Sequence, residues 1–190
     1  MKTQDFWKGE GGDAYTLRSD IDWRKRTSFW RDTIPVDVNT VFECGTNLGS
    51  NLRAIRACRS VSVSGIELNE SAVGAAQARG LAVVHQDLLT MQAFPLADLV
   101  FTCGVLIHMS PDQIGDAMER VAALSKRYVM AVEYASESGQ EEHVNYRGSD
   151  DLLWRRDYGR LYEAMGLRLM RSGDAGDGFD RCRFWLMRKG

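Results

Sequence analysis

The chain has 190 residues, of which 44% are hydrophobic and 26% are charged, and its formal net charge is −2 at pH 7. This length allows one domain with a substantial core, and the composition is that of an ordinary globular protein. The small negative charge argues against broad electrostatic binding of nucleic acid, which depends on clustered lysine and arginine.

The first 20 residues mix aromatic, glycine and charged side chains in an order that has neither helical nor strand periodicity. Phe6, Trp7 and Tyr15 are costly to leave in water, so we expect this segment to pack on the protein. A tail on the surface and a lid over a ligand are equally compatible with these residues. From Trp23 onward, apolar side chains recur at helical spacing and predict an amphipathic helix that Pro35 ends.

The stretch from Val41 to Asn51 predicts a short buried strand, a loop interrupted by glycines and the start of a helix. Gly45 and Gly49 allow the backbone to approach a ligand closely, and Asn47 between them tolerates a left-handed conformation. The free N–H groups of such a loop favour an electron-rich or anionic ligand group. A loop of this kind also joins ordinary strand–helix units, so it does not by itself establish a binding site.

The rest of the chain alternates between strand and helix patterns. We expect strands at 61–67, 81–84, 96–103 and 128–132, and helices at 52–58, 70–79, from Ser110 onward and at 150–165. Asn69 is the expected N-cap of the second of these helices and Gly80 its C-terminal glycine. This alternation predicts a mostly parallel sheet with helices on both faces. Two final strands, 167–171 and 182–188, predict an antiparallel hairpin at one edge.

The sequence contains no linker, repeat or membrane-spanning apolar run, so we expect a single domain over residues 1–190. Within it, residues 1–35 form an N-terminal lid and helix, and residues 36–190 form the core with an insertion at about 134–150. Four cysteines without paired spacing and three histidines without metal-ligand spacing predict a reducing, cytoplasmic location and no metal site. The polar N-terminus and the absence of an apolar run also predict no membrane partner.

Polar residues gather where the predicted strands end. Ligands of open parallel sheets bind beyond the carboxyl ends of the strands. The residues expected there are Glu43, Gly45, Glu67, Asp87, Cys103, Gly104, Glu133 and Tyr134. Glu67 suits a ribose, although it could instead be an acid at a helix start, and Asp87 suits an adenine amino group or a simple turn. These acids fit NAD and S-adenosylmethionine equally well.

Four segments resemble, in order and spacing, the successive motifs of class I S-adenosylmethionine-dependent methyltransferases: VFECGTNLGSNL, GIELN, HQDLL and DLVFTCGVLIHMSPD. Two more, FWKGEGGDAYTLRSD and VNYRGSDDLLWRRDYG, resemble the methylases associated with pseudaminic acid biosynthesis. The resemblance implies an α/β, single Rossmann-like domain with a seven-stranded, mostly parallel sheet whose C-terminal strand is antiparallel. It also implies S-adenosyl-L-methionine as cofactor and a small-molecule substrate, such as a nonulosonic acid or its nucleotide-activated form.

The resemblance also implies roles for individual residues. Around the methionine part of the cofactor it places Glu43, Gly45, Thr46, Asn47 and Gly49, with Tyr15 and Arg18 closing over the carboxylate. Around the nucleoside and the transfer point it places Glu67, Leu68, Asp87, Leu88, Cys103 and Gly104. Asn47 departs from the commoner glycine at the middle of this loop, and Arg18 is equally compatible with an exposed surface position.

For catalysis, His108 is the preferred candidate base because it follows the fourth core strand and titrates near neutrality. It could instead only shape its loop. Glu133 and Tyr134 end the next strand and complete the predicted catalytic set. The predicted substrate-binding residues are Tyr146, Arg147 and Arg155, with the arginines recognising a carboxylate or phosphate. The alternative for Arg155 and its neighbour Arg156 is a solvated helix face.

A second class of function remains open at this stage. An oxidoreductase with a nucleotide cofactor, or a binding module, would use the same core without methyl transfer. The terminal hairpin favours the methyltransferase. The choice between O- and N-methylation is also open, and so is the oligomeric state.

Overall fold

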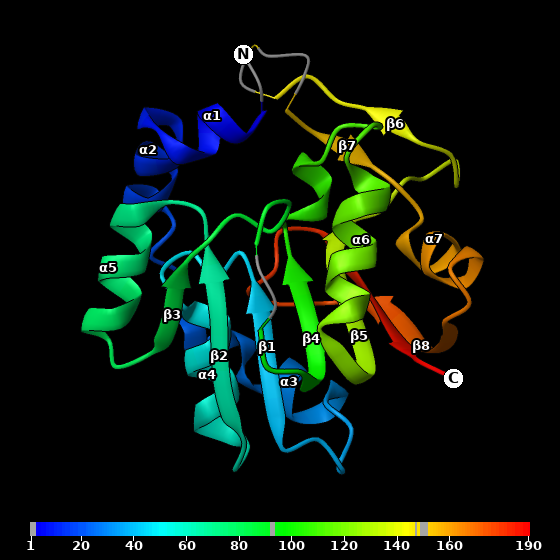
Figure 1. Ribbon diagram of the computed structural model, residues 1–190, viewed down its shortest axis with the longest axis horizontal. Coiled ribbons are helices and arrows are strands. Elements are labelled where there is room, and N and C mark those ends of the chain that lie inside the picture. The colour runs from blue at the N-terminus through cyan, green and yellow to red at the C-terminus, as the bar shows by residue number, and fades with distance from the viewer. Residues whose placement is uncertain (1–2, 92–93, 147, 149–151) are drawn as a thin grey trace.

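The computed structural model describes residues 3–91, 94–146, 148 and 152–190. Its centre is a sheet of seven strands in the order β3-β2-β1-β4-β5-β9-β8 (Figure 1). The strands are β1 (Thr40–Cys44), β2 (Ser62–Glu67), β3 (Ala82–His85), β4 (Ala97–Cys103), β5 (Ser125–Tyr134), β8 (Arg168–Asp174) and β9 (Cys182–Arg188). The first five run parallel, and β9 is antiparallel to both of its neighbours. The predicted sheet and its terminal hairpin are therefore confirmed.

Helices cover both faces of this sheet. One face carries α3 (Thr27–Thr33), α4 (Ser50–Cys58) and α5 (Glu70–Ala78), and the other carries α6 (Ile114–Ala123) and α7 (Tyr158–Ala164) (Figure 1). Alternation along the strands explains the two layers, because successive side chains point to opposite faces. Val41 packs with the α3–α5 layer and Phe42 with the α6–α7 layer. Each layer contains a large, fully buried aromatic side chain: Trp30 in the α3–α5 layer and Tyr162 in the α6–α7 layer.

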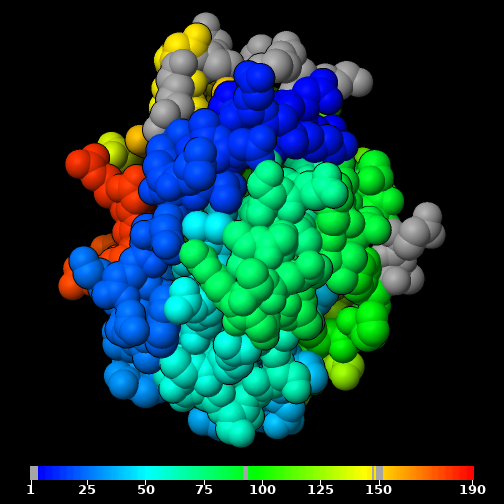
Figure 2. Space-filling model, turned by 90° about the vertical axis from the view of Figure 1, so that its left-hand side faces the viewer, coloured from blue at the N-terminus to red at the C-terminus, as the bar shows by residue number. Residues whose placement is uncertain are grey.

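The N-terminal segment is helical, which corrects the expectation of irregular structure. It forms α1 (Thr3–Lys8) and α2 (Glu10–Arg18), followed by the 3-10 helix η1 (Trp23–Arg26). Gly11 and Gly12 weaken the helical pattern in the sequence, because glycine is a poor helix former. Close packing of α1 against α2 requires a glycine at position 12, because a Cβ on Gly12 would collide with the backbone carbonyl of Trp7. In Figure 1, α1 and α2 lie beyond the carboxyl ends of the strands, and in Figure 2 the same dark blue helices lie near the top of the molecule.

The segment after β5 also differs from the prediction. Residues 154–155, expected in a helix over 150–165, form β7 (Trp154–Arg155), which pairs with β6 (Glu142–His143) in a separate two-stranded sheet. The helix α7 begins only at Tyr158, where the Asp157 carboxylate accepts from the N–H of Arg160. Asp150 and Asp151, expected in the first turn of this helix, lie outside the described residues.

Helix termini elsewhere follow the sequence signals. The Asn69 side chain accepts from the N–H of Ala72 at the start of α5, and Gly80 after its end has φ = 73°. The helix expected from Ser110 begins at Ile114, after a turn in which the Gln113 side chain accepts from the backbone N–H of Ser110. Among the helices of the described ranges, none has the length and apolarity required to cross a bilayer.

Candidate functional site

Two adjoining cavities lie at the carboxyl ends of the strands. The β2–β3 cavity, of about 130 Å³, is enclosed by the ends of β2 and β3 and by the N-terminal helices. The β5–β9 cavity, of about 440 Å³, extends from the end of β1 to the starts of β9 and the insertion. Of the residues that the structure describes, six line both cavities: Tyr15, Gly45, Asn47, Cys103, Gly104 and His108. The larger volume falls in the range of small-molecule sites.

The glycine loop after β1 forms the wall between the cavities. Gly45, Asn47 and Gly49 all have positive φ, at 79°, 45° and 76°. The predicted left-handed Asn47 is therefore confirmed. A Cβ on Gly45 would collide with the Val105 side chain, and a Cβ on Gly49 would collide with Leu81. The loop is held in this shape because the N–H groups of Gly45 and Thr46 both donate to the carbonyl of Ile66.

Glu43 is the last residue but one of β1 and is only 1% exposed. Its Oε1 atom accepts from the Asn51 side chain at 2.7 Å, whereas Oε2 has no hydrogen-bond partner among the described residues. Burial raises the pKa of Glu43 to about 8. Arg26, missed in the sequence, donates to the Asn51 side-chain oxygen at 2.8 Å and so orients this amide. Glu43 therefore presents an unsatisfied oxygen where it lines the β5–β9 cavity.

Glu67 ends β2 and lines the β2–β3 cavity. Its Oε2 atom accepts from the N–H of Asn47 at 2.7 Å, and its Oε1 atom accepts from the N–H groups of Leu68 and Asn69, each at 2.8 Å. Desolvation raises the pKa of this carboxylate despite these bonds. Glu67 thus joins the glycine loop to the start of α5, and its Oε2 atom, which accepts from one N–H, retains lone-pair capacity for a ligand hydroxyl.

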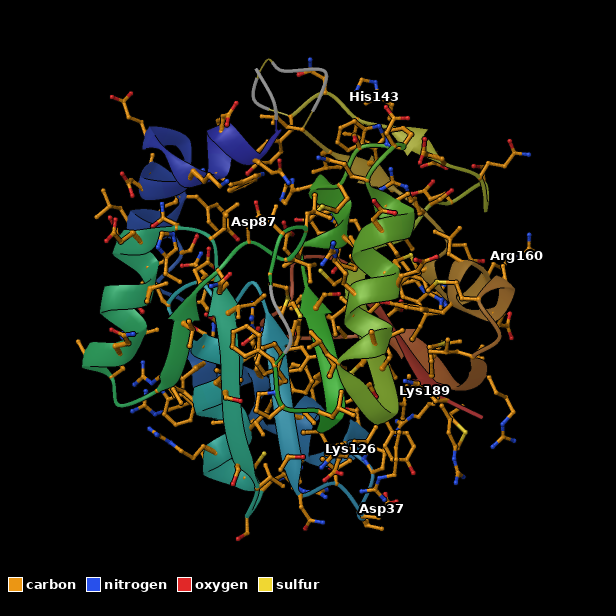
Figure 3. All side chains as sticks on the ribbon, in the orientation of Figure 1. Asp37, Asp87, Lys126, His143, Arg160 and Lys189 are labelled. Carbon is orange, nitrogen blue, oxygen red and sulfur yellow. The ribbon has the colours of Figure 1, made fainter. Side chains whose placement is uncertain are left out.

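Asp87 follows β3 at the floor of the same cavity, below α1 (Figure 3). Its Oδ1 atom accepts from the N–H of Leu89 at 2.9 Å, as expected of a turn aspartate. Its Oδ2 atom pairs with the Lys8 side chain at 3.3 Å, which the sequence did not predict. Leu68 and the buried Leu88 line the cavity beside it.

The N-terminal helices supply aromatic walls. The Trp7 ring lies 4.3 Å from the His108 ring and packs edge-on against Tyr15 at 5.4 Å, measured between ring centroids. Arg18 lines the β5–β9 cavity, where its guanidinium lies over the Tyr15 ring and donates to the carbonyl of Ala14. The sequence marked Trp7 only as a side chain that must be covered, because its place in a cavity depends on how α1 docks.

His108 belongs to the 3-10 turn η2 (Leu106–His108) and lines both cavities. Its Nδ1 atom lies 2.6 Å from the carbonyl oxygen of Leu152, so Nδ1–H donates and Nε2 is left as an acceptor. Desolvation lowers the pKa of His108 to about 4. The ring is therefore neutral near pH 7, and it joins η2 to the segment that leads into β7.

Glu133 lies beneath η2 and is fully buried. Its carboxylate accepts from the N–H groups of Val105, Leu106 and Ile107 at 3.2 to 3.4 Å, and burial raises its pKa to about 7. In the described part of the chain it is not among the residues that line either cavity. Glu133, expected in the catalytic set, is thus not brought to the described cavity lining and holds the loop that bears His108.

Tyr134, the next residue, does face the β5–β9 cavity. Its hydroxyl donates to the Asp180 carboxylate at 2.6 Å, and burial together with that carboxylate raises the pKa of Tyr134. Asp180 lines the same cavity. The sequence indicated only a glycine- and aspartate-rich loop there, and nothing in it distinguishes Asp180 from its neighbours. Tyr146 also lines this cavity and packs edge-on against His108.

The predicted substrate arginines are not gathered at the cavities. Arg147 lies outside the described residues. Arg155 of β7 lies opposite Glu142 of β6 in the register of the two-stranded sheet, and it is not among the described residues that line the β5–β9 cavity. Arg156, expected on a solvated face, is only 2% exposed. Its guanidinium donates to the carbonyls of Leu106 and Met109 and pairs with Glu141 at 2.6 Å. Arg156 therefore supports η2 from the side of the insertion.

Replacing Arg156 with Ala should lower the free energy of unfolding by about 3 kcal/mol, because two buried carbonyls lose their donors. Chemical denaturation measures this change. Arg155→Ala is the matched control, since this neighbouring half-buried arginine should change stability by no more than about 0.5 kcal/mol. Equal losses in the two variants would contradict the role given to Arg156.

Comparison with known proteins was made by sequence and by structure. No family model and no curated protein matches the sequence. Magnesium protoporphyrin IX methyltransferase from Synechocystis PCC 6803, solved with bound SAM, has a TM-score of 0.71 at 17% identity, over 98% of this chain and 95% of that one. The chain has a methyltransferase fold. A 1,6-didemethyltoxoflavin-N1-methyltransferase from Burkholderia thailandensis has a TM-score of 0.72 at 16% identity, over 98% and 86% of the two chains.

A sugar N-methyltransferase from Streptoalloteichus sp. ATCC 53650 has a TM-score of 0.70 at 13% identity, over 95% of this chain and 93% of that one. At these identities the likeness establishes the fold alone. It confirms the Rossmann-like architecture that the sequence motifs implied. Function must therefore be argued from the two cavities themselves.

Proposed function

We propose that this chain is an S-adenosylmethionine-dependent methyltransferase that acts on a small molecule. The observation that supports this most directly is the unsatisfied Glu43 oxygen at the glycine loop, which separates the β2–β3 cavity from the larger β5–β9 cavity. A buried carboxylate oxygen without a partner is rare unless a ligand supplies the donor. The methionine end of the cofactor bears an ammonium group, which is a suitable donor.

The residues present fit the other parts of the cofactor. Asn47 has a buried side-chain oxygen that no described group satisfies, and it lies in the wall that both cavities share. Gly45 lines both cavities and has no Cβ, which would collide with the Val105 side chain there. Glu67 offers acceptors for ribose hydroxyls, and Asp87 with Leu88 would hold the adenine. Tyr15 and Arg18 would cover the methionine carboxylate from the N-terminal side.

When bound, the cofactor supplies a methyl group already activated by a positively charged sulfur. The protein must then orient the acceptor and exclude water. His108, neutral and held by Leu152, offers Nε2 as an acceptor for a hydrogen bond. Tyr134 fixes the Asp180 carboxylate at the far wall of the β5–β9 cavity. We assign His108 to orientation of the acceptor, and Asp180 to binding the hydroxyl or amino group that loses a proton.

Two substitutions of His108 test the functions of its two ring nitrogens separately. His108→Asn retains a donor near the Nδ1 position, and His108→Gln retains a polar group near Nε2. Because the bond to Leu152 positions both η2 and the insertion, we expect Asn to keep about 10-fold more turnover than Gln. Affinity for S-adenosylhomocysteine should change little in either variant. Turnover that is unchanged in both would remove His108 from the reaction.

The cofactor assignment is tested by calorimetry with S-adenosylmethionine, S-adenosylhomocysteine and NAD. We expect the two adenosyl compounds to bind and NAD not to bind. Tight binding of NAD alone would favour an oxidoreductase or a binding module with the same core. Binding of none of the three would also contradict the proposal.

For the acceptor, we propose a nonulosonic acid of the pseudaminic type or its nucleotide-activated form, on the strength of the resemblance in the N-terminal and insertion segments. Arg26 lines the β5–β9 cavity and offers positive charge to a carboxylate. Mass spectrometry of reactions with these acids, their nucleotide forms and matched neutral amino sugars should reveal a gain of one CH₂ unit on the acids. A gain on the amino sugars alone would contradict this acceptor and leave methyl transfer intact.

A further inference from the structure

Trp7 has a polar atom whose use neither the fold nor the assigned cofactor residues explains. Its indole Nε1 is buried and has no hydrogen-bond partner in the described part of the chain. The residue lines the β2–β3 cavity, opposite Glu67 and Asp87. A buried indole N–H normally finds an acceptor, because an unsatisfied one loses its hydration without compensation.

The structure holds Trp7 firmly over this cavity. Its backbone carbonyl accepts from the Asn69 side chain at 3.4 Å, and that same side chain donates to Asp13 of α2 at 2.9 Å. Its neighbour Lys8 pairs with Asp87 at 3.3 Å. Two elements of the strand-end edge therefore fix α1, and the position of the indole does not depend on its own polar atom.

An unsatisfied N–H alone would not indicate a ligand, because Trp23 also has a buried Nε1 without a partner in the described residues. The two tryptophans differ in their surroundings. Trp23 lies between the guanidinium groups of Arg24 and Arg53 and lines neither of the two cavities as described. Trp7 lies in a cavity wall that also contains carboxylate acceptors. The combination of a donor and acceptors around one cavity matches a nucleobase, which presents ring-nitrogen acceptors beside amino donors.

We propose that Trp7 is a nucleoside-binding residue: its indole N–H donates to an acceptor atom of the nucleoside, and its ring covers the nucleoside in the β2–β3 cavity. This inference rests on the proposed function and adds a contact from the N-terminal helix. It also gives α1, which is held at the ends of β2 and β3, a direct part in ligand binding. The contact of the Trp7 ring with His108 then joins nucleoside binding to the η2 turn.

The test compares Trp7→Phe with the matched variant Trp23→Phe, using S-adenosylhomocysteine and adenosine as separate ligands in calorimetry. Phe keeps an aromatic ring and removes the donor. We expect Trp7→Phe to weaken both ligands by the same factor of about 3- to 10-fold, as for loss of one neutral hydrogen bond. Trp23→Phe should leave both affinities unchanged. Trp7→His, which retains a ring N–H, should recover part of the loss.

A second measurement does not depend on the variant's affinity. In ¹⁵N-labelled protein with all five tryptophans, the indole N–H resonance that is missing in Trp7→Phe should shift on addition of adenosine, and the Trp23 resonance should not. If Trp7→Phe does not fold, the resonance is assigned from Trp7→His instead.

The outcomes distinguish failure of the proposed function from failure of the role assigned to Trp7. Wild-type protein that does not bind S-adenosylhomocysteine would overturn the proposed function and this inference with it. Normal binding by the wild type with unchanged affinities in Trp7→Phe, or no shift of its resonance, would overturn the role of Trp7 alone. Equal losses in Trp7→Phe and Trp23→Phe would also overturn it, because they would indicate a general packing effect.

Discussion

Replacing Gly45 with Ala should abolish measurable binding of S-adenosylhomocysteine while leaving the protein folded. Gly45 has φ = 79° and lines both cavities, and a Cβ there would collide with the Val105 side chain. The backbone strain should cost about 1–2 kcal/mol of stability. The collision adds to this and moves the loop that divides the cavities, so we expect at least a 100-fold loss of affinity by calorimetry, about 2.7 kcal/mol.

Gly80→Ala is the matched control for this prediction. Gly80 has φ = 73°, almost the same as Gly45, but it follows α5 and a Cβ there meets nothing within 4 Å. Both variants should therefore lose similar stability from backbone strain, and only Gly45→Ala should lose binding. Parallel losses of binding would show that strain, and not the shape of the glycine loop, controls the affinity.

The sequence predicts well which residues lie at the binding edge of the sheet, because the carboxyl ends of parallel strands lie at the same edge. Once the alternation of strands and helices is recognised, Glu43, Glu67 and Asp87 must lie near one another at the carboxyl ends. The structure places all three there, around the left-handed Asn47 that the sequence also predicts. These predictions depend on local periodicity and on glycine chemistry, which a single sequence contains.

Contacts between distant segments account for most of what the sequence could not predict. Arg156 looks like half of an exposed pair in the sequence, yet it is buried because the insertion folds back onto η2. Asp180 gains its role from the Tyr134 hydroxyl on another strand. The glycines of α2 weaken its helical pattern in the sequence, and the helix is stabilised by packing against α5. In each case the partner is far along the chain, so no local pattern indicates it.

Glu133 illustrates a different limit. Its position at the end of β5 is predicted correctly. Its side chain, however, points beneath the η2 turn, where it accepts from three backbone N–H groups of residues 105–107. Tyr134, one residue later, points to the opposite side and faces the β5–β9 cavity. Because successive side chains along a strand point to opposite faces of the sheet, the position at the strand end did not determine which of these two residues would face the cavity.

Glu43→Gln should have two opposite effects, and both follow from burial. The folded pKa of about 8 exceeds the ordinary value of 4.5, so the folded state binds more protons than the unfolded chain between these pH values. The stability of the wild type should therefore fall as pH rises from about 4.5 to about 8 through this group. Gln keeps the bond to Asn51 without a charge, so the stability of the variant should fall less than that of the wild type over this pH range. Thermal unfolding followed from pH 5 to pH 9 measures the difference.

The same substitution should weaken S-adenosylhomocysteine by about 10- to 100-fold, because a neutral amide replaces a charge-assisted partner of the ligand ammonium. Arg26, which favours the charged form of Glu43, and Glu67, which disfavours it, are present in both proteins. A variant that is more stable at alkaline pH and binds more weakly would be expected of a residue kept for function at a cost in stability.

Proton release gives the most direct test of this role. Near pH 7 the Glu43 carboxyl is mostly protonated, and a ligand ammonium beside it should lower its pKa again. Binding of S-adenosylhomocysteine should then release up to about one proton, measured by calorimetry in buffers with different ionisation enthalpies. Adenosine lacks the ammonium and should release none, and Glu43→Gln should abolish the release on binding of S-adenosylhomocysteine. Release that persists in Glu43→Gln would mean that another group titrates on binding and that the free oxygen of Glu43 does not receive the ammonium.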